Sequence, residues 1–133
     1  MNWIDVKKQL EDSDLDAIEK ELQIQLPDEY RSKVKKINGG ALKAAYYPSK
    51  KYGNIAFARN TNLSPDTKAN AAFLAKIINK KDIRYFPFGS VGNGDYFCLD
   101  LHNNRVVLYA HEEEKILELC SSYREFMGNL MEK

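Results

Sequence analysis

Apolar residues recur at helical spacing near the start of the chain. Between residues 14 and 22 they lie three or four positions apart, which predicts an amphipathic helix capped by Ser13 or Asp14. The shared face of this helix carries Leu15, Ile18 and Leu22. An earlier turn from Trp3 to Leu10 would lead into it.

A second helix is predicted from Pro27 to Ile37. Proline suits the first helical position, because an N–H at that position would have no partner within the helix. The buried stripe of this helix is expected to be Tyr30, Val34 and Ile37. Gly39 and Gly40 follow closely, and glycine readily adopts the left-handed conformation that ends a helix.

The middle of the chain predicts two strands and a third helix. Short apolar runs at 42–48 and 54–59 indicate a pair of neighbouring strands. Residues 64–81 indicate a helix that Ser64 caps. Its apolar contacts are expected from Phe73, Leu74, Ile77 and Ile78.

A hairpin with strands at 95–101 and 105–110 gives the clearest strand pattern. A two-residue turn at Asn103 and Asn104 would place Asp100 opposite Val107. Because side chains alternate along a strand, the hairpin has two faces. The core face is expected to hold Phe97, Leu99, Leu101, Val106, Leu108 and Ala110. The outer face is expected to hold Tyr96, Cys98, Asp100, His102, Arg105, Val107, Tyr109 and His111.

Two further elements complete the predicted fold. Residues 84–88 indicate a strand that lies at a sheet edge or ends at Pro87, because proline cannot donate to a ladder. Residues 112–131 indicate a C-terminal helix whose apolar face would carry Ile116, Leu119, Tyr123, Phe126 and Leu130. This order lacks the strand–helix alternation of a parallel sheet. We therefore predict an α+β fold, with a mostly antiparallel sheet flanked by helices, in a single domain over residues 1–133.

The charge of the chain is segregated, although its composition is that of an ordinary soluble protein. Residues 1–30 hold three basic and nine acidic residues, a net of −6. Residues 31–81 hold twelve basic and one acidic (+11), and residues 82–133 hold five and nine (−4). Either these blocks steer a charged partner, or folding brings them together so that they neutralise one another.

The N-terminal residues are polar and acidic, and they do not resemble an export signal. No apolar run approaches the roughly 20 residues that a membrane span requires. We therefore expect a cytoplasmic protein that does not bind a membrane. Cys98 and Cys120 are expected to be buried free thiols.

Three glycines, Gly89, Gly92 and Gly94, precede Asp95 and raise the possibility of a phosphate site. A phosphate loop places differently spaced glycines before a helix, and a Lys-Ser or Lys-Thr pair follows them. These glycines precede a strand, and no such pair follows. They are predicted to turn the chain into the hairpin.

Asp95, Asp100, His102 and His111 are the candidate metal ligands. In the predicted hairpin the two histidines lie about 20 Å apart, so one ion cannot bind both. Asp100 is expected instead to pair diagonally with Arg105. Neither of the two cysteines occurs in a sequence pattern typical of a catalytic nucleophile, and the same holds for the serines. We predict no catalytic site, no metal and no cofactor.

Several motifs occur in a recognisable order. Trp3 is followed by "AIEKELQIQLPDEYRSKVKKINGG", then by "FPFGSVGNGDYFCLDL" and by "SSYREFMGNLM". In this order and spacing the chain resembles the SMI1/KNR4 family of the SUKH superfamily. Residues 43–81 match no pattern of that family.

The resemblance implies an α+β domain without catalysis. Bacterial members resemble immunity proteins, each of which binds and blocks a toxin, often a nuclease, encoded beside it; fungal relatives act as regulatory or scaffolding proteins. Asp95 and Asp100 match motif positions, and we expect them to fix the turn and the hairpin. The structural motif is expected to comprise Trp3, Pro27, Gly39, Gly40, Gly89, Gly94 and Asp95.

Contact with a toxin would require exposed aromatic residues, because these dominate interface hot spots. The candidate contact residues are Tyr46, Tyr47, Tyr52, Tyr96, Asp100 and Tyr109. Alternatively, each of these tyrosines is a half-buried residue of the sheet that makes no contact with a partner. A second function class, nucleic-acid binding or a regulatory scaffold, would use residues 43–59, which interleave aromatic and basic side chains. A net charge of only +1 argues against nucleic-acid binding.

Overall fold

The computed structural model describes residues 1–133, the whole of the printed sequence. It contains four helices and seven strands, in the order α1 (Asp12–Leu22), α2 (Asp28–Ile37), β1 (Ala41–Ser49), β2 (Gly53–Asn60), α3 (Ala71–Asn79), β3 (Tyr85–Ser90), β4 (Tyr96–Asp100), β5 (Arg105–Ala110), β6 (Lys115–Cys120), α4 (Tyr123–Asn129) and β7 (Met131–Glu132).

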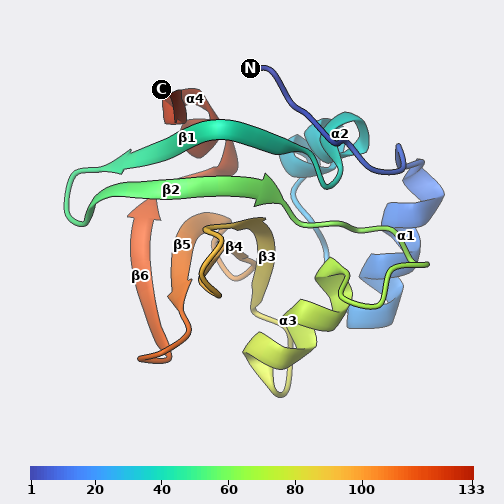
Figure 1. The fold of residues 1–133 in the computed structure, drawn as a ribbon. Coiled ribbons are helices and arrows are strands. Elements are labelled where there is room, and N and C mark those ends of the chain that lie inside the picture. Colours follow the sequence, from blue (N-terminus) through green and yellow to red (C-terminus); the bar gives the residue numbers. More distant parts are fainter.

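The strands form one antiparallel sheet in the order β6-β5-β4-β3-β2-β1-β7. The sheet is curled; α1, α2 and α3 lie along one side of the picture, and α4 lies behind β1 (Figure 1). A single cluster of 25 buried residues draws on all four helices and on the sheet. The predicted α+β class and its antiparallel sheet are confirmed.

The two N-terminal helices follow the sequence pattern closely. Leu15, Ile18 and Leu22 are buried on α1, as predicted. This helix begins two residues earlier than expected, and the N–H of Glu11 donates to the Asp14 carboxylate at 2.8 Å. On α2 the predicted stripe of Tyr30, Val34 and Ile37 is buried, and Pro27 lies at its N-cap.

The third helix differs from its prediction in both its start and its face. It begins at Ala71, where the Asn70 side chain accepts the N–H of Phe73, and not at Ser64. Ser64 is buried in the preceding loop, within 3.2 Å of the Asn38 side-chain amide. The buried face consists of alanines, namely Ala71, Ala72 and Ala75. Phe73 and Ile77 are 50% and 55% exposed, so the prediction that they pack inward is wrong.

The predicted C-terminal helix over 112–131 is also wrong in its first half. Residues 115–120 form strand β6, which pairs with β5, and only residues 123–129 are helical. Ile116, Leu119 and Tyr123 are spaced for one helical face, but the same segment also fits a strand. Pairing with β5 resolves this ambiguity, and Ser122 then caps α4 by accepting the N–H of Glu125.

The hairpin of β4 and β5 has a longer turn than predicted. Asp100 lies opposite Arg105 and Tyr96 lies opposite Tyr109, a shift of two residues from the expected register. A shift of two leaves every side chain on the same face of the sheet. Of the predicted core-face residues within the two strands, Phe97, Leu99, Val106 and Leu108 are buried, whereas Ala110, at the end of β5, is only half-buried.

Strand β3 lies inside the sheet, and not at an edge as predicted from Pro87. The proline is accommodated because β2 pairs with β3 only at Arg59–Ser90 and Asn60–Gly89. The carbonyl of Pro87 accepts the Thr61 hydroxyl at 2.9 Å, and α3 packs beside this part of β3. Proline therefore occupies the part of the strand that has no ladder partner on that side.

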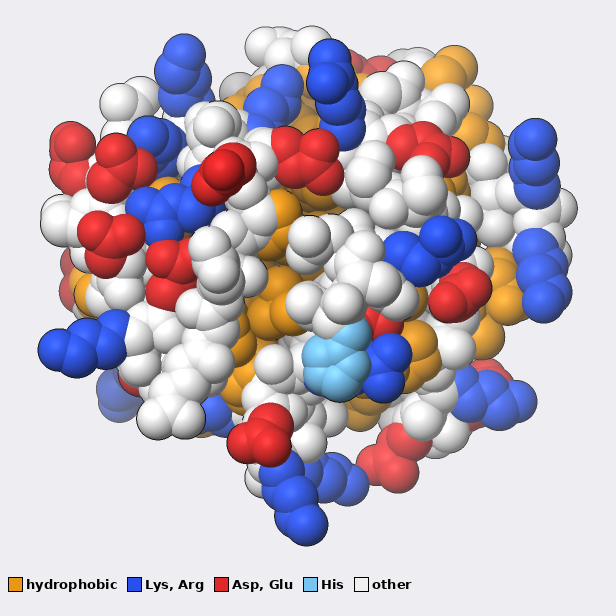
Figure 2. Space-filling view, turned by 180° about the vertical axis from the view of Figure 1, so that it is seen from behind, with side chains coloured by type: hydrophobic (Ala, Val, Ile, Leu, Met, Phe, Trp, Pro, Cys, Tyr) orange, Lys and Arg blue, Asp and Glu red, His pale blue; other side chains and the backbone are white.

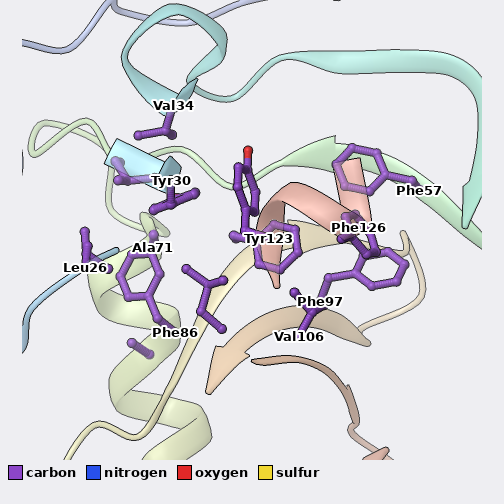
Figure 3. Packing of buried hydrophobic residues seen from close by; sticks show 14 of the residues in the cluster. Leu26, Tyr30, Val34, Phe57, Ala71, Phe86, Phe97, Val106, Tyr123 and Phe126 are labelled. Carbon is purple, nitrogen blue, oxygen red and sulfur yellow. The ribbon is translucent and has the colours of Figure 1, made fainter. Parts of the chain in front are cut away.

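Aromatic rings form the centre of the core. Figure 3 shows Phe57, Phe97 and Phe126 packed beside one another. Phe126 lies 4.9 Å from Phe97, 5.2 Å from Phe88 and 4.7 Å from Tyr47, measured between ring centroids. Trp3 adds an edge contact to Phe57 at 6.0 Å. Helix α4 thus joins β1, β3 and β4 through one side chain.

Candidate functional site

A row of side chains crosses five strands on the outer face of the sheet, from β2 to β6. Arg59 of β2 lies opposite Ser90, Ser90 lies opposite Tyr96, and Tyr96 lies opposite Tyr109. Tyr109 in turn lies opposite Ile116 of β6. Directly opposed residues of antiparallel strands point to the same face. We call these residues the tyrosine row: Arg59, Ser90, Tyr96, Tyr109 and Ile116. All are half-buried, so each presents part of its side chain to solvent.

A polar pocket of about 330 Å³ adjoins one end of the tyrosine row. Arg59, Ser90 and Tyr96 belong to both the row and the pocket. The other lining residues come from the N-terminal segment, the α2–β1 turn, the end of β2, the following loop and α3: Lys7, Gly39, Asn60, Thr61, Asn62, Thr67, Ala69 and Leu74. Row and pocket together form a continuous candidate surface.

Two of the predicted contact residues do not lie at the surface. Tyr47 is buried and stacks on Phe126, and Asp100 is 4% exposed. Their prediction as contact residues is therefore wrong. The side chain of Tyr47, in β1, faces α4. The carboxylate of Asp100 is already paired with Arg84.

The other predicted tyrosines are accessible but do not form one surface by strand pairing. Tyr96 and Tyr109 are neighbours in the tyrosine row. Tyr46 is half-buried on β1 opposite Ala56, and Lys133 lies over its ring at 5.8 Å. Tyr52, which is 37% exposed, lies in the turn between β1 and β2.

Asp100 makes an internal ion pair with Arg84, and not with Arg105 as predicted. Arg84 Nε and Nη2 each donate to one carboxylate oxygen at 3.0 Å. The His102 N–H donates to the same carboxylate at 3.1 Å. Burial acts to raise the pKa of Asp100, but these hydrogen bonds outweigh it and hold the pKa below its ordinary value. Asp100 thus fixes the start of the β4–β5 turn.

This lowered pKa predicts a pH dependence of stability. A carboxylate whose pKa falls on folding stabilises the fold above its unfolded pKa of about 3.9, and that contribution is lost as pH decreases toward the folded pKa. Asp100→Asn is expected to lower the free energy of unfolding by about 1–3 kcal/mol at pH 7, with a deficit that narrows below about pH 4. Urea titrations between about pH 3 and pH 7 measure the difference in unfolding free energy between the variant and the unmodified chain.

Asp66→Asn is the matched control, since Asp66 is exposed and makes no ion pair. Its unfolding curve should follow that of the unmodified chain at every pH. An Asp100→Asn deficit that is equally large at pH 3 and pH 7 would show that the Arg84 ion pair does not stabilise the fold.

Asp95 holds the turn before β4 against the turn after β5. Its carboxylate accepts the His111 N–H at 3.0 Å and lies 2.6 Å from His111 Nδ1. Gly94 has a φ of +99°, and a Cβ there would lie 2.9 Å from the His111 ring. Gly92 also has a positive φ, of +104°. Gly89, in contrast, lies within β3 against Phe57 and Phe97, so its prediction as a turn residue is wrong.

The side chains that could bind a metal ion or act as a thiol nucleophile are dispersed or buried. Nowhere in the chain do three His, Cys, Asp or Glu residues gather closely enough to hold a metal ion. Cys98 and Cys120 are free and buried, as predicted, and burial raises the pKa of both thiols. The raised pKa leaves less of each thiol as the reactive thiolate near neutral pH.

The segregated charges partly neutralise one another in the folded chain. Arg31 pairs with Asp16 at 2.9 Å and also with Glu19. Lys76 pairs with Glu21 at 2.6 Å, which again joins the basic block to the acidic N-terminal block. Figure 2 shows basic and acidic side chains interspersed on the face seen from behind. On this face the sequence blocks do not form a surface of a single sign.

Sequence reasoning missed three members of the tyrosine row: Arg59, Ser90 and Ile116. Arg59 lies in a predicted strand of unknown pairing, and Ser90 lies beyond the predicted strand at 84–88. Ile116 lies in the predicted C-terminal helix, which is strand β6 in the structure. Alternation along 54–59 places Arg59 on the same face as Phe57, so it does not predict that Arg59 lies on the outer face. Only the pairing of β2 with β3 brings Arg59 beside Ser90 and Tyr96.

Comparison with known proteins places the chain in a family. The family model described as SMI1-KNR4 cell-wall (SUKH_6) matches residues 12–127, which run from the start of α1 into α4. A search of curated proteins finds no match. None of the helices combines the length and the apolar character that crossing a membrane requires. The family match covers nearly the whole fold, and the chain therefore belongs to the SMI1/KNR4 family of the SUKH superfamily.

Proposed function

We propose that this chain is an immunity protein, a single SMI1/KNR4-like domain of residues 1–133 that binds and neutralises a cognate bacterial toxin in the cytoplasm. The family match carries this proposal, because the SUKH family is associated with immunity proteins. Neutralisation by binding requires a complementary surface and no reaction. The tyrosine row supplies that surface in the proposal.

The tyrosine row suits protein binding for physical reasons. Tyrosine and arginine are enriched among the residues that contribute most to interfaces, because they combine a large contact area with a polar tip. Strand pairing holds the backbones of Tyr96 and Tyr109 side by side, so the two rings are presented together without any rearrangement of the sheet. The row ends in an apolar residue, Ile116, on one side and in a cationic residue, Arg59, on the other.

Co-expression tests the proposal. The gene next to this one, where it encodes a secreted protein with a toxin-like C-terminal part, is expressed in bacterial cells with and without this chain. The chain is expected to restore growth. The double variant Tyr96→Ala/Tyr109→Ala is expected to lose protection and to bind the toxin at least about 100-fold more weakly, since two hot-spot residues each contribute about 2 kcal/mol or more.

Tyr52→Ala is the matched control, because Tyr52 is an exposed tyrosine in the β1–β2 turn, away from the row. It should protect cells as well as the unmodified chain. Growth arrest in the presence of the unmodified chain would reject the immunity proposal. Full protection by the double variant would reject the tyrosine row as the contact surface.

A second candidate function uses the β1–β2 hairpin. Lys43, Lys50 and Lys51 are exposed and make no ion pair, and Lys51 lies over the Tyr52 ring at 5.5 Å. Such cations beside aromatic rings suit single-stranded nucleic acid or a regulatory partner. Salt-dependent binding of labelled RNA, lost in Lys50→Gln/Lys51→Gln, would favour this function over toxin binding.

A further inference from the structure

The polar pocket beside the tyrosine row has a distinctive charge. Its lining includes two cations, Lys7 and Arg59, and no carboxylate. Hydroxyl and amide groups supply most of the remaining wall, from Asn60, Thr61, Asn62, Thr67, Ser90 and Tyr96. A volume of about 330 Å³ is large enough for one amino-acid side chain and its backbone. The lining therefore favours a small anionic group.

The Asn-Gly-Gly sequence after α2 builds one wall of this pocket. The Lys7 N–H donates to the Asn38 carbonyl at 2.8 Å. Gly39 has a φ of +67°, and a Cβ there would overlap the Lys7 side chain. Because Gly39 has no side chain, the aliphatic part of the Lys7 side chain can lie against the Gly39 backbone. Lys7 is thereby held at the wall of the pocket.

Asn38 fixes the opposite part of the wall. Its buried side-chain amide donates to the Asn62 side-chain oxygen at 3.1 Å, and its side-chain oxygen accepts the Leu63 N–H at 2.7 Å. Asn62 in turn donates to the Thr67 hydroxyl at 3.2 Å. The loop after β2 is therefore held in place by hydrogen bonds, and the pocket exists before any ligand binds.

The two cations have unused capacity for an anion. Lys7 makes no ion pair, and the nearest carboxylate to Arg59 is that of Asp5, at 4.0 Å. The Asp5 and Arg59 side chains are 68% and 43% exposed, so water weakens this long contact. A carboxylate at hydrogen-bonding distance would bind the planar guanidinium more strongly, through two parallel N–H···O bonds.

We infer that the pocket receives an aspartate or glutamate side chain of the protein partner. The inference rests on the proposed function, and it assigns the partner's chemistry. The contact between Asp5 and Arg59 shows that a carboxylate can approach this guanidinium, here to 4.0 Å. The tyrosine row continues from Arg59 and Tyr96, so the residues that flank the partner's carboxylate would lie along the tyrosines.

Nuclear magnetic resonance with short peptides tests this inference without the toxin. The ¹⁵N-labelled full chain is titrated with acetyl-Gly-Glu-Gly-amide, and acetyl-Gly-Gln-Gly-amide is the uncharged control. The glutamate peptide is expected to shift the amide signals of Thr61, Asn62 and Ser90 in a saturable, salt-sensitive way. Arg59→Gln/Lys7→Gln is expected to weaken this binding about tenfold or more, because charge-assisted hydrogen bonds are lost.

Lys50→Gln is the control variant, since Lys50 is an exposed, unpaired cation in the turn between β1 and β2. It should bind the glutamate peptide as the unmodified chain does. The inference is overturned if the glutamine peptide produces equal shifts, or if the double variant retains them. Tighter binding of inorganic phosphate than of the glutamate peptide would also overturn it, in favour of a phosphate ligand.

The peptide result and the co-expression result are independent. Pocket binding of the glutamate peptide without protection from the toxin would reject the immunity proposal and keep the carboxylate site. The opposite result would be protection that survives in Arg59→Gln/Lys7→Gln, together with no binding of the glutamate peptide by the unmodified chain. That result would keep the immunity proposal and reject the carboxylate site.

Discussion

Replacing Phe126 with alanine is expected to lower the free energy of unfolding by about 3–5 kcal/mol, the usual cost of emptying a buried phenylalanine site. Phe126 contacts Tyr47, Phe57, Phe88 and Phe97, so its loss opens a cavity between α4 and four strands. Rigid aromatic rings on several elements cannot all move inward to fill that cavity. Urea unfolding followed by circular dichroism measures the effect.

The adjacent helix position provides the control for this prediction. Met127 lies on the same helix but is only partly buried, and Met127→Ala should cost much less than Phe126→Ala. Phe126→Leu should fall between them, because leucine refills part of the volume. Equal destabilisation by Phe126→Ala and Met127→Ala would mean that Phe126 is not the centre of the core.

Replacing Gly89 with valine is the second change with a large expected effect. A Cβ at this position would lie 2.6 Å from Phe57 Cε2 and 3.4 Å from Phe97 Cδ2. Both rings are fully buried, so neither can move aside without disturbing its own neighbours. We expect a loss of about 1–3 kcal/mol or more, typical of overpacking, and thermal unfolding at a lower temperature.

Gly128→Ala is the matched glycine control. Gly128 lies in α4, and an added Cβ would meet nothing within 4 Å. Because alanine favours a helix over glycine, this variant should be neutral or more stable by about 0.5–1 kcal/mol. If Gly89→Val were as stable as Gly128→Ala, the close packing of β3 against the Phe57 ring would not exist in solution.

The contact surface shows how far the candidate site could be predicted. Tyr96 and Tyr109 were predicted as contact residues from residue type and strand alternation, and both lie in the tyrosine row. Tyr47 is predicted from residue type alone, and it is buried because it stacks on Phe126 in the core. Residue type alone could not separate these tyrosines, since their exposure depends on which element packs over each strand.

The sequence by itself determined the local elements whose pattern is unambiguous. The stripes of α1 and α2, the two faces of the β4–β5 hairpin and the family all follow from residue spacing along the chain. The helix stripes and the hairpin faces depend on the period of a helix or of a strand, which is a property of neighbouring residues. The family depends on the order and spacing of the motifs along the chain.

Only the tertiary structure decided the rest. Residues 115–120 fit either a helix or a strand, and hydrogen bonding to β5 made them a strand. The pairing of β2 with β3 brought Arg59 to Ser90 and Tyr96, and α3 turned its alanines inward and left Phe73 and Ile77 exposed. The physical reason is that pairing and burial join residues far apart in the chain, and a local pattern of side chains does not specify which distant partner each segment meets.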